Sequence, residues 1–123
     1  MTFKVLIVDD DYINRMLLVS LLKKELYKID ILESVDGRDA LNVFKKHPDI
    51  QLILLDIEMP RMDGAEFLKH YIKDPSLKKV PVIAVSSNDL RVKEVLKLGA
   101  SSFLVKPVTK EKLLGAIRKA QAI

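Results

Sequence analysis

Short apolar runs recur along the chain and predict the strands of a sheet. The runs are rich in β-branched residues, and four of them are clear while a fifth is weaker. The clear runs occupy residues 3–8, 52–55, 80–85 and 103–105, and the weaker one occupies residues 29–32. Most of the runs are continuously apolar rather than alternating, which is typical of parallel strands covered by helices on both faces.

Apolar residues at helical spacing lie between these runs and predict five helices, each with its apolar stripe against the sheet. The stripes are Ile13, Met16, Leu17 and Leu21; Leu41 and Phe44; Phe67, Leu68, Tyr71 and Ile72; Val92, Val95 and Leu96; and Leu113, Leu114 and Ile117. Residues that favour helix ends stand beside the stripes, at Asp36-Gly37, Asp63-Gly64, Gly99 and Thr109. The pattern predicts a single domain over residues 1–123, built from five strand–helix units.

Five such units predict an α/β fold, a doubly wound five-stranded parallel sheet with helices on both faces. In this class of fold, ligands bind outside the carboxyl ends of the strands. Polar residues stand at those ends: Asp9 and Asp10 after the first strand, Asp56 after the third, Ser86 after the fourth and Lys106 after the fifth. We therefore expect these five side chains to lie along one edge of the sheet. Pro60 is expected to direct the chain away from the third strand.

Composition narrows the cellular setting. The chain contains no cysteine, which excludes disulfides and thiolate metal sites and favours a cytoplasmic location. No apolar run approaches the roughly 20 residues that a membrane span needs, so no membrane insertion is expected.

The net charge of +4 is unevenly distributed. Residues 1–63 carry 9 Lys and Arg against 12 Asp and Glu, whereas residues 64–123 carry 12 against 5. The lysines of the basic half alternate with apolar residues at helical spacing, as in LRVKEVLKLGA. This arrangement is typical of solvated helix faces, and we expect no direct binding to nucleic acid.

Three carboxylates at one edge repel one another unless a cation lies among them. Magnesium, or manganese in its place, prefers oxygen ligands of this kind, and we expect Asp10 and Asp56 to bind it directly while Asp9 acts through water. The ammonium of Lys106 and the hydroxyl of Ser86 are suited to hold the oxygens of a phosphoryl group that arrives at a carboxylate. Phosphoryl transfer depends mainly on positioning and charge neutralisation, so this set predicts formation of an aspartyl phosphate.

Each of these residues taken alone also fits a structural role. Asp9 to Asp11 can cap the first helix, Lys106 can be a surface charge, and Ser86 can be a loop hydroxyl. The combination of all five favours the phosphoryl site.

Four segments, in order, resemble the receiver domain of response regulators over essentially the whole chain. They are VLIVDDDYINR at the first strand, LILLDIEMPRMDG at the third, PVIAVSS at the fourth and GASSFLVKP at the fifth. The resemblance implies the flavodoxin-like strand order 2-1-3-4-5. It also implies that Asp56 is the phosphoacceptor, that Asp9, Asp10, Asp56 and the backbone carbonyl of Glu58 bind the metal, and that Lys106 pairs with the phosphoryl group. The Lys106-Pro107 peptide bond is expected to be cis, which is uncommon even before proline.

The same resemblance implies a conformational switch. Ser86 is expected to move toward the new phosphoryl oxygens, and the ring of Phe103, where Tyr is frequent, to turn inward. The partner surface would then comprise the fourth helix, fifth strand and fifth helix, about residues 89–119. The stretch from Ser86 to Gly99 is about two residues shorter than usual, which predicts a truncated or irregular start of the fourth helix.

The main hypothesis is therefore a signalling module rather than an enzyme, although it would catalyse its own phosphorylation and dephosphorylation. The expected donor is a histidine kinase or histidine phosphotransfer protein, the expected recipient of the signal is a downstream protein effector, and the chain is expected to be a monomer or weak dimer. An alternative is a haloacid-dehalogenase-like phosphatase with Asp9 as nucleophile, because LIVDDDYI contains Asp-x-Asp after a strand. In that alternative two acids should follow a late strand, whereas the late strands here are followed by Ser-Ser and Lys-Pro. A flavodoxin-like electron carrier is weaker still, because the first strand–helix loop is acidic where a phosphate-binding loop is needed.

Overall fold

A computed structural model describes residues 2–26, 28–59 and 62–121, and Pro60 lies outside them. Five strands pair in parallel in the order β2-β1-β3-β4-β5, which confirms the predicted sheet. The strands are β1 (Phe3–Val8), β2 (Ile29–Ser34), β3 (Leu52–Asp56), β4 (Val82–Ser86) and β5 (Ser102–Val105). The helices are α1 (Tyr12–Glu25), α2 (Gly37–Lys46), α3 (Gly64–Lys73), α4 (Val92–Lys97) and α5 (Lys110–Gln121), and a 3-10 turn, η1 (Asp89–Arg91), precedes α4.

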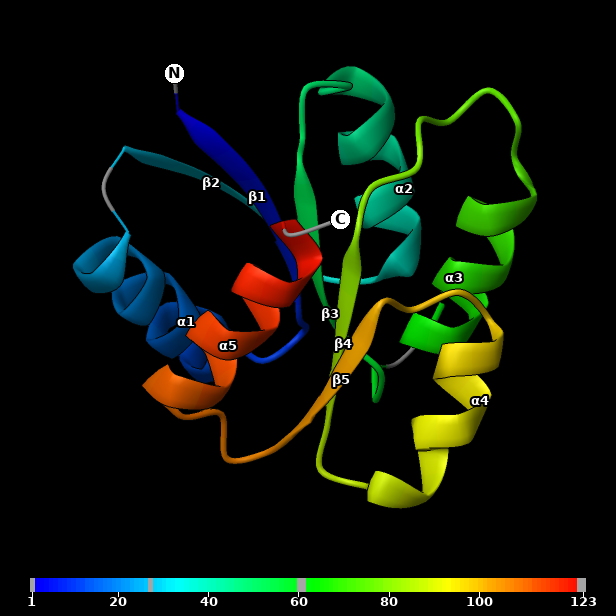
Figure 1. Ribbon diagram of the computed structural model, residues 1–123. Coiled ribbons are helices and arrows are strands. Elements are labelled where there is room, and N and C mark those ends of the chain that lie inside the picture. Colours follow the sequence, from blue (N-terminus) through cyan, green and yellow to red (C-terminus); the bar gives the residue numbers. More distant parts are fainter. Residues whose placement is uncertain (1, 27, 60–61, 122–123) are drawn as a thin grey trace.

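Helices cover both faces of the sheet. In Figure 1, α1 and α5 lie on one face, and α2, α3 and α4 lie on the other. Every residue of β3 and β4 is buried. Successive residues of β3 enter opposite cores: Ile53 and Leu55 pack on the α2–α4 side, whereas Leu52 and Leu54 pack on the α1–α5 side. Burial on both faces explains why these strands read as continuous apolar runs.

The helix caps agree with the sequence. The side chains of Asp36 and Asp63 accept hydrogen bonds from the backbone N–H groups of Asp39 and Glu66, in the first turns of α2 and α3. Thr109 likewise accepts one from the N–H of Lys112 in α5. Gly99 follows α4 with a φ of 112°, in the region that favours glycine.

The fourth strand begins two residues later than its apolar run. The backbone N–H of Val80 donates to the Tyr71 hydroxyl at 2.6 Å, and Pro81 has no N–H to offer to the ladder. Tyr71 is itself fully buried and stacks on Phe67. The start of β4 is therefore set by the hydroxyl of a core tyrosine.

The predicted apolar face of α1 is wrong for Ile13, Met16 and Leu17, whereas the fourth predicted residue, Leu21, packs partly buried against the core on the α1–α5 side. Ile13, Met16 and Leu17 are 55%, 43% and 60% exposed, and the buried residues are instead Leu18 and Leu22. The helix contains two overlapping apolar stripes, and the spacing within one helix does not decide which of them meets the sheet. Ile72 in α3 and Leu96 in α4 are also largely exposed, at the outer edges of their stripes.

The predicted irregularity of the fourth helix is confirmed. The 3-10 turn η1 leads into an α4 of only six residues, in which Val95 is the buried side chain. Among the described residues, no helix combines the length and apolar character needed to cross a membrane.

Candidate functional site

Four neighbouring strand ends bring the predicted polar residues to one edge of the sheet. Asp9 follows β1 and Asp56 is the last residue of β3, while Ser86 ends β4 and Lys106 follows β5. The backbone N–H of Lys106 donates to the carbonyl of Ser86 at 2.9 Å, so the last two of these strands stay paired up to the edge. The structure therefore confirms the prediction that these residues lie along one edge of the sheet.

The start of α3 lies directly against the end of β3. The N–H of Gly64 donates to the carbonyl of Ile57 at 3.0 Å. A Cβ at position 64 would stand 2.6 Å from the carbonyl oxygen of Asp56, so only glycine fits this approach. The Asp-Gly pair thus serves as a cap and as a close contact that fixes the loop beyond Asp56.

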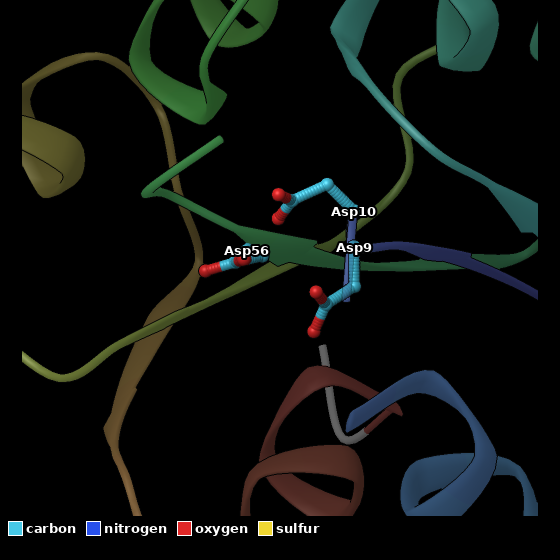
Figure 2. A group of neighbouring side chains, drawn as sticks. All are labelled: Asp9, Asp10 and Asp56. Carbon is cyan, nitrogen blue, oxygen red and sulfur yellow. The ribbon is translucent and has the colours of Figure 1, made fainter. Parts of the chain in front are cut away.

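Asp9, Asp10 and Asp56 form a compact acidic cluster. Each offers one carboxylate oxygen, and these oxygens lie within 4.8 Å of one another. Figure 2 shows the three side chains gathered at the adjacent ends of β1 and β3. Asp9 and Asp56 are almost fully buried, whereas Asp10 is exposed. The cluster therefore opens to solvent on the side of Asp10.

Burial makes negative charge costly at this site. Burial, followed by the charge of Asp9, raises the pKa of Asp56 from 3.8 to about 7. Burial also raises the pKa of Asp9, although the N–H of Asp11 donates to its Oδ1 at 2.9 Å and opposes the shift. The ammonium of Lys106, 3.6 Å from Asp56 Oδ1, partly compensates the Asp56 charge.

The carboxylate oxygens of this cluster are suited to bind a hard divalent cation. Oδ1 of Asp56 is buried and takes part in no hydrogen bond within the part of the chain that the structure describes. Three carboxylates with oxygens within 4.8 Å of one another, one of the groups open to water, match the oxygen ligation and partial hydration that magnesium prefers. The residues present thus suit the predicted cation, which Asp9, Asp10 and Asp56 would hold.

The side chain of Glu58 has a contact that the sequence did not predict. Ser86, which is completely buried, donates its hydroxyl hydrogen to Glu58 Oε2 at 2.5 Å. Ser87 donates from its backbone N–H to Glu58 Oε1 at 3.1 Å. Sequence reasoning assigned Glu58 only a backbone role, and its position two residues after Asp56 was the single available signal.

The Lys106-Pro107 peptide bond is cis, as the resemblance implied. Beside it, a cavity of about 590 Å³ extends from Asp9 and Lys106 along α1. Its lining is mainly apolar and includes Leu17, Leu18 and Val108. Phe103 is partly buried and packs against the core on the α2–α4 side.

The site therefore combines a buried carboxylate, an acidic cluster suited to a divalent cation, an ammonium group and a buried hydroxyl. The carboxylate can act as a nucleophile, and the other groups can neutralise or bind the oxygens of a phosphoryl group. No acid pair stands at the end of β4 or β5, where the chain has Ser86-Ser87 and Lys106-Pro107.

Comparison with known proteins agrees with this geometry. A family model described as the response regulator receiver domain matches residues 5–118. The two-component response regulator ORR11 of Oryza sativa is 36% identical over 106 residues, which cover 85% of this chain and 71% of the relative. ORR7 from the same species is 34% identical, and there the match covers 50% of the relative.

Two solved structures are similar to this chain over most of their length. A chain in the crystal structure of the CheX-CheY-BeF3-Mg2+ complex from Borrelia burgdorferi is 34% identical, with a TM-score of 0.83 and coverage of 94% of this chain and 86% of that one. The chemotaxis protein CheY4 of Vibrio cholerae is 30% identical, also with a TM-score of 0.83, and coverage is 98% of this chain and 99% of that one.

Proposed function

This chain belongs to the response regulator receiver family, the signalling module of two-component systems, and from that premise we propose that Asp56 accepts a phosphoryl group from a phosphohistidine. The observation that carries the proposal is the buried Asp56 carboxylate, whose Oδ1 lies 3.6 Å from the ammonium of Lys106. The acidic cluster around Asp56 supports the cation requirement of this chemistry.

The transfer step balances as a substitution at phosphorus. A carboxylate oxygen of Asp56 attacks the phosphorus, an O–P bond forms, and the P–N bond to the donor histidine breaks. The electron pair of that bond stays on the imidazole nitrogen, which takes up a proton. The same site returns to its initial state when water attacks the acyl phosphate and inorganic phosphate leaves.

Each side chain at the edge has a separate part in this step. Lys106 pairs with an oxygen of the incoming group and holds it beside Asp56. Ser86 is expected to donate its hydroxyl hydrogen to a second phosphoryl oxygen after transfer. Asp9, Asp10, Asp56 and the backbone carbonyl of Glu58 would hold the cation. A divalent cation bound there supplies neutralisation of the phosphoryl charge.

We assign donor recognition to the exposed apolar face of α1, made of Tyr12, Ile13, Met16 and Leu17. These side chains are 43–64% exposed, and Leu17 also lines the cavity that reaches Asp9 and Lys106. A donor must bring its histidine to Asp56, so an apolar surface continuous with the site is suited to a protein donor. The response to phosphorylation is expected at α4, β5 and α5, through Ser86 and Phe103, for a downstream protein effector.

Acetyl phosphate provides a direct test that needs no partner protein. Incubation with magnesium should add one phosphoryl group, and peptide mass spectrometry should locate it at Asp56. The variant Asp56→Asn should remain unlabelled, whereas Asp30→Asn, an exposed acid on β2, should label like the wild type. Label on Asp9, with turnover of a generic phosphomonoester, would instead support the phosphatase alternative.

A further inference from the structure

The carboxylate of Glu58 binds the two residues that end β4 and begin the next loop. Its Oε2 accepts the hydroxyl of Ser86 at 2.5 Å. Its Oε1 accepts the backbone N–H of Ser87 at 3.1 Å and the Ser87 hydroxyl at 3.3 Å. The side chain therefore bridges the β3–α3 loop and the end of β4, on either side of the site.

The hydroxyl of Ser86 is already committed in this arrangement. Its oxygen accepts the backbone N–H of Asn88 at 3.0 Å, and its hydrogen is directed to Glu58. A serine hydroxyl has one hydrogen to donate, whereas phosphoryl oxygens and carboxylate oxygens are both acceptors. Ser86 can donate to a phosphoryl group on Asp56 only after it has released Glu58.

From this competition we propose that Glu58 is a positioning residue that holds Ser86 in the unphosphorylated arrangement. The inference rests on the proposed function, because it concerns the same Asp56 site. It goes beyond that function by giving the Glu58 side chain, rather than only its carbonyl, a part in the switch. Phosphorylation must break the Glu58–Ser86 hydrogen bond before Ser86 can move.

Arg91 connects this contact with the partner surface. Its guanidinium lies 3.9 Å from Glu58 Oε2 and 3.9 Å from Asp63 Oδ2, and it pairs with Glu94 of α4. Arg91 is the last residue of η1, directly before α4. A change in the direction of the Glu58 carboxylate therefore changes the charge that Arg91 faces at the start of α4.

Two explanations of a Glu58 effect must be separated. Glu58 could disfavour phosphorylation through its bond to Ser86, or simply because a negative charge near a phosphoryl dianion is repulsive. The variant Glu58→Gln removes the charge but keeps an acceptor oxygen, whereas Glu58→Ala removes both. Removal of the Ser86 hydroxyl abolishes the first effect and leaves the second.

The test is a double-mutant cycle on the affinity for beryllofluoride, a phosphoryl analogue, in the presence of magnesium. Affinity would be measured by calorimetry for the wild type, Glu58→Ala, Glu58→Gln, Ser86→Ala and the double variant Glu58→Ala/Ser86→Ala. Because the hydrogen bond is charge-assisted but partly exposed to solvent, we expect Glu58→Ala to tighten binding about fivefold. Glu58→Gln should give a smaller gain.

The decisive comparison is the gain from Glu58→Ala with and without the Ser86 hydroxyl. A gain at least about threefold larger in the presence of the hydroxyl supports the inference. A smaller difference, or no gain from Glu58→Ala alone, overturns it, and equal gains for Ala and Gln assign the effect to charge. Glu111→Gln, at the exposed start of α5, is the matched control for net charge and should bind like the wild type.

The outcome can be distinguished from failure of the proposed function itself. If the wild type neither binds beryllofluoride nor accepts a phosphoryl group at Asp56, both proposals fail. If it does both and the cycle shows no coupling, only the role of Glu58 fails. The backbone amide signal of Ser87, which donates to Glu58, gives an independent readout, because its NMR chemical shift should move in Glu58→Ala and in the analogue-bound wild type alike.

Discussion

At the scale of single residues, Asp56 occupies a position where its ionised form is unfavourable. It is buried at the end of a central strand, and Asp9 and Glu58 add to the cost of its charge while Lys106 reduces it. In the absence of a cation, the ionised carboxylate opposes folding. The position that makes Asp56 available to a phosphoryl group is therefore one that lowers stability.

The first prediction concerns removal of that charge. In EDTA at pH 8, Asp56→Asn should raise the free energy of unfolding by about 2 kcal/mol, because it removes a buried carboxylate whose pKa is far above its unfolded value. This corresponds to a rise in Tm of roughly 5–10 °C, measurable by calorimetry. Asp30→Asn, at an exposed site, should leave Tm nearly unchanged, and a lower Tm for Asp56→Asn would contradict the electrostatic argument.

At the scale of elements, strands were more predictable from sequence than the orientation of helices. Strands buried on both faces appear as unbroken apolar runs, so β3 needed no tertiary information. The buried face of α1 could not be predicted without tertiary information. Leu17 and Leu18 belong to competing apolar stripes, and only packing against β1 and α5 selects Leu18.

The site shows the same division between local and tertiary information. Parallel strands end at a common edge, so the neighbourhood of Asp9, Asp56 and Lys106 follows from topology. The Glu58–Ser86 hydrogen bond joins residues 28 positions apart and depends on how two loops approach each other. The spacing of residue types along the sequence therefore could not predict this hydrogen bond.

The second prediction concerns the exposed face of α1. Leu17→Ser should slow phosphoryl transfer from a phosphorylated histidine phosphotransfer protein about fivefold, because an apolar contact beside the cavity is lost. Labelling by acetyl phosphate should not change, since that small donor needs no protein contact. Leu96→Ser, on the opposite side of the sheet in α4, is the control, and equal loss in both variants would argue against a docking role for α1.

At the scale of the whole molecule, the acidic cluster links stability to pH and to cations. The folded-state pKa of Asp56, about 7, is above the ordinary aspartate pKa of 3.8, so the folded chain holds this proton more tightly than the unfolded chain. The contribution of Asp56 to stability is then complete below about pH 4, falls as the pH rises toward 7, and does not fall further above it. A bound cation favours the ionised form and reverses this loss.

The third prediction follows for metal addition. Magnesium at 10 mM should raise Tm more at pH 8 than at pH 5, because proton and cation compete for the same carboxylates. The difference in Tm between the wild type and Asp56→Asn in EDTA should shrink as the pH falls from 8 to 4. Thermal unfolding followed by circular dichroism measures both, and a pH-independent magnesium effect would contradict the link between metal binding and Asp56.

The shortness of α4 affects the free energy that a conformational change in this helix requires. A helix of six residues is much shorter than the roughly 12–15 residues that an isolated helix needs to be stable in water, and α4 has a single buried side chain, Val95. Its local unfolding therefore requires little free energy compared with global unfolding of the sheet. If α4 responds to phosphorylation as proposed, a modest change at the sheet edge is enough to shift a large fraction of molecules, since opening so short a helix requires little free energy.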